Sequence, residues 1–348
     1  MIVLGIETSC DETSAAVVEN GKKVLSNVVV SQDEYFKPFF GVVPEIASRR
    51  HLEVIQQVVE QALERSGMNL KDVNLIAVTQ KPGLIGSLLV GLSYAKALSF
   101  ATGIPLVPVD HLHAHLYSAF IEENPPLPAL GIVVSGGHTA GFLITENFEF
   151  INIARTRDDA AGEALDKIAK ALNLGYPGGP IIDRLSKKGN PDRFKFSFPK
   201  LKDGSFDFSF SGIKAAAIRK ISELNLNKDH PEFYDFIASF QKTVIEYLLL
   251  RTKEILQHYP SKSLIVAGGV ARNSYLRERF ISWAEKEKIK LVIPPGQYCT
   301  DNAAMVAALG YLLYSEKKVK ADIWITAFSR TEASKGVKQF LSGERHKN

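Results

Sequence analysis

The sequence predicts an α/β protein built from two duplicated lobes, on three observations. Apolar runs typical of strands alternate with longer segments of helical periodicity over residues 2–109. A proline-rich segment at 123–128 then interrupts the chain, and clustered prolines end helices and stiffen connections. After it the opening pattern returns, offset by 126 residues from Gly5 to Gly131, which indicates a duplicated fold.

The elements of the first lobe follow from local pattern. Asn20-Gly21 is a strong hairpin signal between two apolar runs. Gly67 is placed to end a helix whose apolar residues recur at helical spacing. In chain order we expect a strand at 2–6, a polar loop at 7–12, a strand at 13–18, a helix at 44–66, a strand at 75–79, a helix ending at 102 and a strand at 106–109.

The second lobe repeats this pattern with an addition. The motif at 131–139 repeats the glycine, serine and threonine spacing of the motif at 5–13, and the run 264–267 resembles the run 75–78. The segment 192–212 alternates phenylalanine with polar and basic residues. We expect short strands with one apolar face there, and a base-stacking surface is the alternative.

These patterns predict the domain organisation. We expect an N-terminal lobe at 1–125, completed by a C-terminal helix at 301–325. A C-terminal lobe at 126–300 would carry the insertion near 190–212, and a basic tail would follow at 330–348.

Composition favours a cytoplasmic globular protein. The hydrophobic content of 45% is ordinary, and the net charge of +4 permits a polyanionic partner without requiring one. The longest apolar stretch, 87–109, contains Lys96 and turn residues, and no basic region precedes the N-terminal apolar run, so we expect neither a membrane span nor a signal peptide. Cys10 and Cys299 form no Cys-x-x-Cys pair, and we expect both to be buried.

Three histidines stand within five residues after the strand at 106–109. Asp110 is placed to cap a helix running to residue 122. On that helix His111 and His115 share a face, as two ligands of one metal ion do, whereas His113 points elsewhere. The alternative is that they are ordinary buried polar groups, and the clustering favours the ligand pair.

Two histidines need an anionic oxygen to complete a metal site. Asp301 is our candidate. It precedes an alanine-rich helix at 303–314, where an aspartate could instead be a simple N-cap. The pattern leaves both interpretations open.

Glycine pairs and nearby carboxylates indicate a site for an anion or nucleotide. The loop 134–138 lies between two strands, and the segment 268–273 lies between a strand and a helix, so backbone N–H groups in either could approach a phosphate. Neither segment matches a dinucleotide fingerprint or a Walker A loop. Asp183, beside a glycine turn, could accept hydrogen bonds from ribose hydroxyls. A solvated helix face accounts for Asp159 and Glu163.

Taken together, these residues resemble the tRNA N6-adenosine threonylcarbamoyltransferase family. Its bacterial members (TsaD) also bear the older name glycoprotease-like proteins, and its other members are of the Kae/Qri type. The resemblance runs from Gly5 to about Ser329. One departure is Phe40, where the family usually has a second glycine before Gly41. The matching motifs lie at 5–14, 42–49, 82–84, 111–115, 134–138, 176–180, 210–214 and 268–273.

The resemblance implies the fold of actin, sugar kinases and heat-shock ATPases: two ribonuclease-H-like lobes with ligand between them. It implies that His111, His115 and Asp301 hold one divalent metal ion, and both iron(II) and zinc accept such ligands. It also implies that an adenine nucleotide, as threonylcarbamoyl-AMP, ATP or ADP, is bound by Val134, Ser135, Gly136, Gly137, His138, Asp166, Gly179, Asp183 and Asn273.

The reaction that the resemblance implies transfers a threonylcarbamoyl group to the exocyclic amine of adenosine 37 in tRNA, with AMP as leaving group. Such an amine is a poor nucleophile and must lose a proton. We expect Asp11 to be the base and Glu12 the second candidate. A turn-forming aspartate is the alternative for Asp11.

The implied partners are tRNA, a smaller paralogous subunit of the same fold (TsaB-like), a P-loop ATPase (TsaE-like) and an enzyme that supplies threonylcarbamoyl-AMP. The competing functions are an ATPase or sugar kinase of the same fold and an O-carbamoyltransferase acting on a small molecule. A metalloprotease is disfavoured because Leu112 stands where the zinc-protease helix carries its glutamate.

Overall fold

The computed structural model describes residues 1–319 and 321–330. The chain divides into two compact units: Met1–Asn124 with the segment that begins at Pro294, and Pro125–Ile293. Most of the expected basic tail lies outside the described residues.

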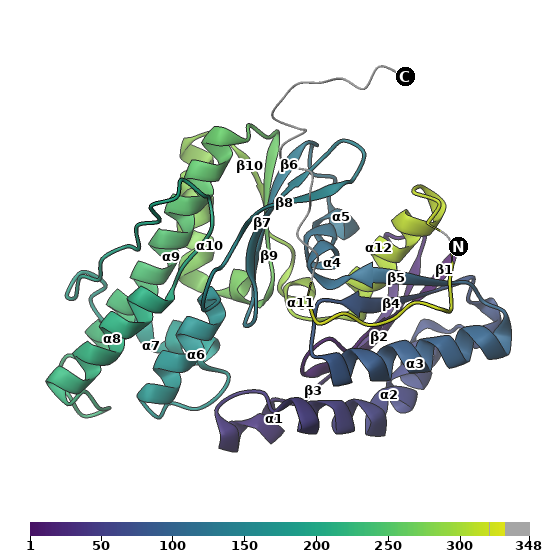
Figure 1. Ribbon diagram of the computed structural model, residues 1–348, viewed down its shortest axis with the longest axis horizontal. Helices are drawn as coiled ribbons and strands as arrows, with labels where there is room; N and C mark the ends of the chain where they lie inside the picture. Colours follow the sequence, from purple (N-terminus) through teal and green to yellow (C-terminus); the bar gives the residue numbers. More distant parts are fainter. Residues whose placement is uncertain (320, 331–348) are drawn as a thin grey trace. The chain divides into compact units, whose positions relative to one another are not determined.

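The first unit is a mixed five-stranded sheet with helices on both faces (Figure 1). Its strand order is β3-β2-β1-β4-β5. β2 runs antiparallel to both of its neighbours, β1 and β3, whereas β4 and β5 run parallel to the central β1. The elements are β1 Ile2–Glu7, β2 Glu12–Glu19, β3 Lys23–Ser31, α1 Asp33–Phe36, η1 Lys37–Phe39, α2 Pro44–Ser66, η2 Leu70–Asp72, β4 Leu75–Lys81, α3 Ile85–Thr102, β5 Leu106–Asp110, α4 His111–Tyr117, α5 Ala119–Glu122, α11 Gly296–Cys299 and α12 Ala303–Ser315.

Local chemistry explains several of these boundaries, and the expected strands and helices are confirmed except for two helices whose extent differs. Asn20 and Gly21, with φ of 51° and 68°, form the turn between β2 and β3. Gly67, with φ of 71°, ends α2 by donating its N–H to the last turn. The helix expected over 111–122 is instead divided at Ser118. The C-terminal helix ends at Ser315, not near 325, and Lys318 beyond it has a left-handed φ of 52°.

The two faces of this sheet are covered by different kinds of packing. Leu4 and Ile6 of β1 point into an apolar core shared with α2 and α3. Gly5, between them, faces α12, and a Cβ built on it would lie 2.3 Å from the carbonyl oxygen of Ala303. Gly310 approaches Ala77 of β4 equally closely on the same face, with 2.4 Å between the two Cβ positions. Small residues therefore let α12 lie directly on the strands.

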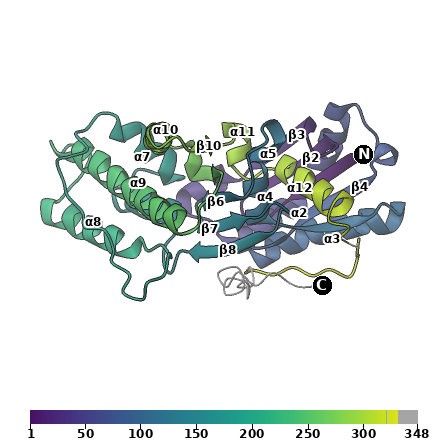
Figure 2. The same cartoon turned by 90° about the horizontal axis from the view of Figure 1, so that it is seen from above.

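The second unit repeats the topology of the first. Its strand order is β10-β9-β6-β7-β8, with β6 in the central position and the same pattern of parallel and antiparallel neighbours. The long α9 lies beside α8 in both views (Figure 1, Figure 2). The elements are β6 Ala129–Val134, β7 Thr139–Ile144, β8 Phe150–Arg155, α6 Ala161–Ala171, α7 Gly178–Ser186, α8 Ser211–Leu224, α9 Phe233–His258, β9 Ser263–Ala267, η3 Gly269–Arg272, α10 Ser274–Lys286 and β10 Lys290–Val292.

The expected duplication is confirmed by strand register, with one correction. Gly5 pairs with Ala16 in the first sheet and Gly131 pairs with Phe142 in the second, which preserves the offset of 126 residues. On the parallel side, Gly5 lies opposite Ala77, and Gly131 opposite Ile265. The sequence comparison of the runs 75–78 and 264–267 instead aligns Ala77 with the residue after Ile265. This shift of one residue is the correction, and it arises because short apolar runs align equally well one residue apart.

The prediction of short strands in the insertion at 192–212 is wrong. The segment is irregular as far as residue 210, apart from one bridge between Thr156 and Phe208, and α8 begins at Ser211. Its phenylalanines instead pack inward: Phe208 and Phe210 are fully buried, and Phe196 makes edge contacts with Phe236 and Phe240 of α9. Most of the aromatic side chains are thus used for packing and are not free to stack on bases.

The helix α3 is the only one among the described residues that is long and apolar enough to cross a membrane. Only 33% of α3 is buried. Its buried residues include Ser87, Gly91 and Ala95, a stripe with helical spacing that packs against α2 and β4. Core helices of soluble proteins can be equally long and apolar.

Phe40, the departure from the family pattern, has a φ of 54° at the end of η1. This left-handed conformation favours glycine, which explains why a glycine suits the position. The following Gly41 also has a positive φ, of 158°.

We predict that Gly5→Ala destabilises the protein by about 3 kcal/mol, because the new methyl group would overlap the backbone of α12. Thermal unfolding followed by calorimetry measures this effect. Gly212→Ala is the matched control, since a Cβ there meets nothing within 4 Å. Equal unfolding temperatures for the two variants would contradict the packing described above.

Candidate functional site

The candidate metal site begins at the junction of β5 and α4. Asp110 ends β5 and caps α4, as expected: its Oδ1 accepts hydrogen bonds from the N–H groups of Leu112 at 2.9 Å and His113 at 3.2 Å. The cap fixes where the helix starts. It therefore fixes the side on which His111 and His115 project.

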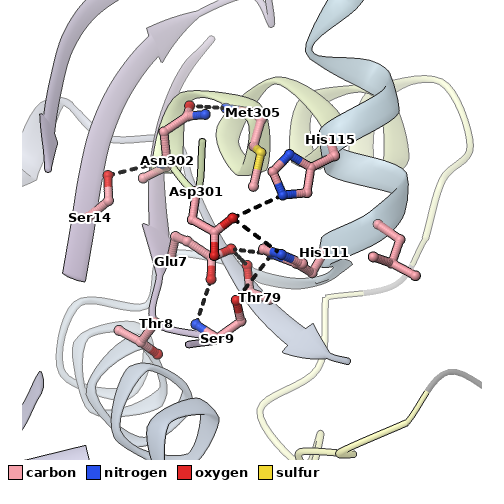
Figure 3. Close-up of polar contacts among 12 residues, drawn as sticks. Glu7, Thr8, Ser9, Ser14, Thr79, His111, His115, Asp301, Asn302 and Met305 are labelled. Atoms are coloured by element: carbon pink, nitrogen blue, oxygen red, sulfur yellow. Dashed lines mark hydrogen bonds and ion pairs between the residues drawn. The ribbon is translucent and has the colours of Figure 1, made fainter. Parts of the chain in front are cut away.

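His111, His115 and Asp301 come together as a compact, largely buried group (Figure 3). The two imidazole rings are 4.6 Å apart and nearly perpendicular. Asp301 Oδ1 lies 3.0 Å from Nε2 of His115 and 3.5 Å from Nε2 of His111. One ligand atom from each residue lies within 4.8 Å of the others, whereas His113 lies outside the group.

The capping role considered for Asp301 is performed by its neighbour. Asn302 caps α12, and its Oδ1 accepts a hydrogen bond from the N–H of Met305 at 3.1 Å. Ser14 of β2 accepts another from the N–H of Ala303 at 2.9 Å. The carboxylate of Asp301 is thus directed to the histidines and not to the helix end.

The electrostatics of this group favour a cation. Burial lowers the pKa of His111, but the charges of Asp301 and Glu7 outweigh it and raise that pKa to about 9. Burial and the neighbouring His111 lower the pKa of His115. Two nitrogen donors beside an anionic oxygen are a donor group that zinc and iron(II) accept. The residues present therefore fit a divalent metal ion.

Glu7 is a further residue of this site, and it was not identified from the sequence. Its side chain is fully buried, and Oε2 lies 3.1 Å from Nδ1 of His111. Thr79 and the N–H of Ser9 donate to the same carboxylate at 2.5 and 2.6 Å. The available signal was a glutamate at the end of an apolar strand, where an unpaired charge is costly to bury.

Asp11 lies just before β2 and Glu12 is the first residue of that strand, and their side chains hydrogen-bond to each other. Burial and the charge of Asp301 raise the pKa of Asp11, while the hydrogen bond from Glu12 opposes that shift. Burial and the charge of Asp11 raise the pKa of Glu12 well above its usual value. Of the two carboxyl groups, Glu12 therefore holds its proton more readily, and the carboxylate of Asp11 accepts the hydrogen bond from it.

His51 of α2 supports this loop and was also not identified from the sequence. Its Nε2 donates to the carbonyl oxygen of Cys10 at 2.9 Å, and its Nδ1 lies 2.8 Å from Oγ1 of Thr13. Burial lowers the pKa of His51, so the neutral ring is favoured. Cys10, expected to be buried, is half-buried in this loop, whereas Cys299 is buried as expected.

In the second unit the loop 135–138 joins β6 to β7 as a tight turn. The backbone N–H of Ser135 donates to the carbonyl oxygen of His138 at 2.8 Å, and the side-chain oxygen of Ser135 accepts from the N–H of His138 at 3.1 Å. Gly136 and Gly137 are exposed, with open space around their Cβ positions. The loop rests on the start of α6, where a Cβ on Gly162 would lie 2.5 Å from the carbonyl oxygen of Ser135. An anion could therefore approach the two glycine amides.

Three of the polar residues expected to contact a nucleotide accept hydrogen bonds from the first turn of a helix. Asp166 accepts from the N–H groups of Gly178 at 2.8 Å and Gly179 at 3.1 Å at the start of α7. Asp183 accepts from both the N–H and the hydroxyl group of Ser274 at the start of α10, at 3.1 and 2.8 Å. Asn273 caps α10, with Leu276 as donor at 3.0 Å.

The solvated helix face expected for Asp159 is wrong. Asp159 is buried and pairs with Lys167 at 2.5 Å and Lys214 at 2.6 Å. Asp158 accepts from Ser209 and from Ser211 at the start of α8. The two aspartates thus bind the end of the insertion and the first turn of α8. Glu163 is half-exposed, in keeping with the expectation.

Comparison with solved structures shows the class of fold. The chain resembles HypF from T. kodakarensis, with a TM-score of 0.62 and 16% identity over 93% of this chain and 49% of that one. It also resembles the activator of 2-hydroxyisocaproyl-CoA dehydratase from Clostridium difficile, with a TM-score of 0.54 and 16% identity over 92% and 98% of the two chains. The protein therefore has the actin-like ATPase fold, with two related α/β lobes.

Sequence comparison then identifies the family. The family model for TsaD, tRNA N6-adenosine threonylcarbamoyltransferase, matches residues 23–308. The enzyme of that name from Dictyoglomus turgidum is 49% identical over 94% of this chain and 97% of its own length. The one from Bacillus subtilis is 50% identical over 91% of both chains. The chain belongs to the tRNA N6-adenosine threonylcarbamoyltransferase family.

We predict that His111→Ala and Asp301→Ala each weaken binding of Zn²⁺ by more than about 100-fold, since loss of an outer-shell partner already costs about 10–100-fold. Competition with a chromophoric chelator measures the affinity. His113→Ala is the control, because this histidine lies on the same helix but outside the group. Unchanged affinity in the first two variants would exclude these residues as ligands.

Proposed function

We propose that this protein transfers the threonylcarbamoyl group from threonylcarbamoyl-AMP to the exocyclic amine of adenosine 37 in tRNAs that read codons beginning with A. The product is N6-threonylcarbamoyladenosine and the leaving group is AMP. The observation that carries this proposal is identity of 49–50% with enzymes of that name over more than nine-tenths of the chain. The competing ATPase, sugar kinase and O-carbamoyltransferase functions have no comparable support, because the resemblance to such proteins is one of fold alone.

The second unit would hold the nucleotide part of the donor. We assign the phosphate to the exposed amides of Gly136 and Gly137, which carry no side chain to block an anion. We assign the ribose and adenine to the surroundings of Asp183, Gly179 and Asn273, at the N-termini of α7 and α10. The positive ends of these helices favour a ligand of net negative charge, as an adenylate, ATP or ADP is.

The first unit would act on the acyl group. A divalent ion held by His111, His115 and Asp301 would polarise the donor carbonyl as a Lewis acid. Either zinc or iron(II) suits these three ligands. The burial of both histidines limits competition from water at the site.

We propose Asp11 as the base that accepts the proton of the adenosine amine. Asp11 is 9% exposed and largely buried in the loop before β2. The hydrogen bond with Glu12 orients it, and His51 holds the loop through the carbonyl oxygen of Cys10. Burial raises the pKa of Asp11, which brings a carboxylate nearer to the range suited to a base at neutral pH.

The reaction would need other proteins. We propose tRNA, a smaller paralogous subunit, a P-loop ATPase and a supplier of threonylcarbamoyl-AMP as partners, and the cytoplasm as the location. Leu52 of α2 and Leu89 and Phe100 of α3 are 70%, 45% and 82% exposed. Large exposed apolar side chains support a protein partner for this unit.

Mass spectrometry of tRNA nucleosides tests the reaction. Purified protein is incubated with unmodified tRNA, threonine, bicarbonate, ATP and the candidate partner proteins. We expect a nucleoside with the mass of N6-threonylcarbamoyladenosine only when this chain is present. Failure to form it with any combination of partners would overturn the proposed function.

We predict that Asp11→Asn lowers the rate of transfer at least about 100-fold, the usual contribution of a positioned base. Binding of Zn²⁺ and of ADP should change little, because Asp11 belongs to neither proposed ligand group. The control is Glu34→Gln, whose side chain is 80% exposed on α1. Wild-type turnover by Asp11→Asn would assign proton removal to another group.

A further inference from the structure

Glu7 brings a carboxylate to the end of β1 without exposure to solvent. A buried carboxylate is stabilised only when its oxygens are paired. Here Oε1 accepts from the N–H of Ser9 at 2.6 Å, and Oε2 accepts from the hydroxyl of Thr79 at 2.5 Å. Burial raises the pKa of Glu7, but the charge and the hydrogen bond of His111 outweigh burial, so the pKa of Glu7 is lowered overall. This direction agrees with a paired carboxylate.

Glu7 and Asp301 approach different nitrogens of the His111 ring. Glu7 Oε2 is 3.1 Å from Nδ1, whereas Asp301 Oδ1 is 3.5 Å from Nε2 (Figure 3). Ser9 Oγ is also 3.2 Å from Nδ1. A carboxylate can only accept, so Nδ1 must carry the hydrogen in this contact. Nε2 is then free of hydrogen whenever the ring is neutral.

The geometry points to Glu7 as the positioning residue that keeps the Nε2 lone pair of His111 available to a divalent cation. A histidine ligand donates its other N–H to a carboxylate or carbonyl, which fixes the tautomer and makes the ring a stronger donor. His115 has no such support, because its Nδ1 is buried without a hydrogen-bond partner. His111 is therefore the more strongly oriented of the two ligands. This inference rests on the proposed metal site.

The same contacts predict what an isosteric amide would do. In Glu7→Gln the one remaining oxygen must stay with the N–H of Ser9, since a backbone donor cannot rotate away. The new NH₂ group then faces Thr79, whose hydroxyl can turn to accept, and Nδ1 of His111. A donor facing Nδ1 stabilises the tautomer with hydrogen on Nε2, which is the wrong form for a ligand.

We expect Glu7→Gln to raise the dissociation constant for Zn²⁺ about 10–100-fold at neutral pH, as measured by chelator competition. Thr79→Val should raise it less, because the carboxylate is retained. Glu122→Gln, an exposed carboxylate of the same unit, should leave it unchanged. Circular dichroism and thermal unfolding verify that each variant is folded.

A measurement on the wild-type protein does not depend on how the variants fold. With Zn²⁺ bound, ¹⁵N NMR of the histidine rings should place the metal on Nε2 of His111 and a hydrogen on Nδ1. Zinc on Nδ1 would overturn the assignment of Glu7.

The outcomes separate the two proposals. Equal Zn²⁺ affinity of folded Glu7→Gln and wild type overturns the role of Glu7 and leaves the metal site standing. No Zn²⁺ binding by the wild type overturns both the metal site and the role of Glu7. Neither result bears on whether the protein modifies tRNA, which the nucleoside assay decides.

Discussion

The packing of α12 directly on β1 and β4 is the constraint on which the first unit depends. The backbone of α12 approaches the two strands so closely that only small residues fit between them. Gly5, Ala307 and Gly310 are the small residues at this contact. Because α12 is held there, Asp301, two residues before the helix, lies beside α4. Asp301 reaches two histidines that precede it by nearly two hundred residues, and Asn302 satisfies the helix end in its place. Site geometry here is a result of core packing.

In the second unit, two residues of the proposed ligand site also hold helix ends in place. Asp166 and Asp183, acidic side chains assigned to ligand recognition, also hold the first turns of α7 and α10. Each is therefore fixed in orientation before any ligand arrives, which lowers the conformational entropy lost on binding. Replacing one of them would alter both a helix end and the proposed site, so the two effects must be measured separately.

Much of this fold is readable from the sequence, because its signals are local. Asn20-Gly21, the Gly67 stop and the Asp110 cap each act within a few residues of the element they define. The repeated strand order also follows from one motif and its offset. The insertion at 192–212 was misjudged because alternating phenylalanines suit a strand face and equally suit packing against one helix.

The candidate site was less accessible to sequence reasoning. The spacing of His111 and His115 on one helix face is local, whereas the choice between ligand and cap for Asp301 depends on where a distant helix packs. Glu7 carries no spacing signal, since its partners come from β4 and α4. A buried carboxylate can be recognised only when the groups that pair with it are in place.

The return of the chain to its first unit has a consequence for synthesis. A ribosome produces β1 to α5 first, then the entire second unit, and only then the segment carrying Asp301 and α12. Until that segment emerges, the first sheet lacks the cover on one face and the histidines lack their carboxylate. The nascent chain therefore cannot bring His111, His115 and Asp301 together until the whole second unit and the segment after it have been translated.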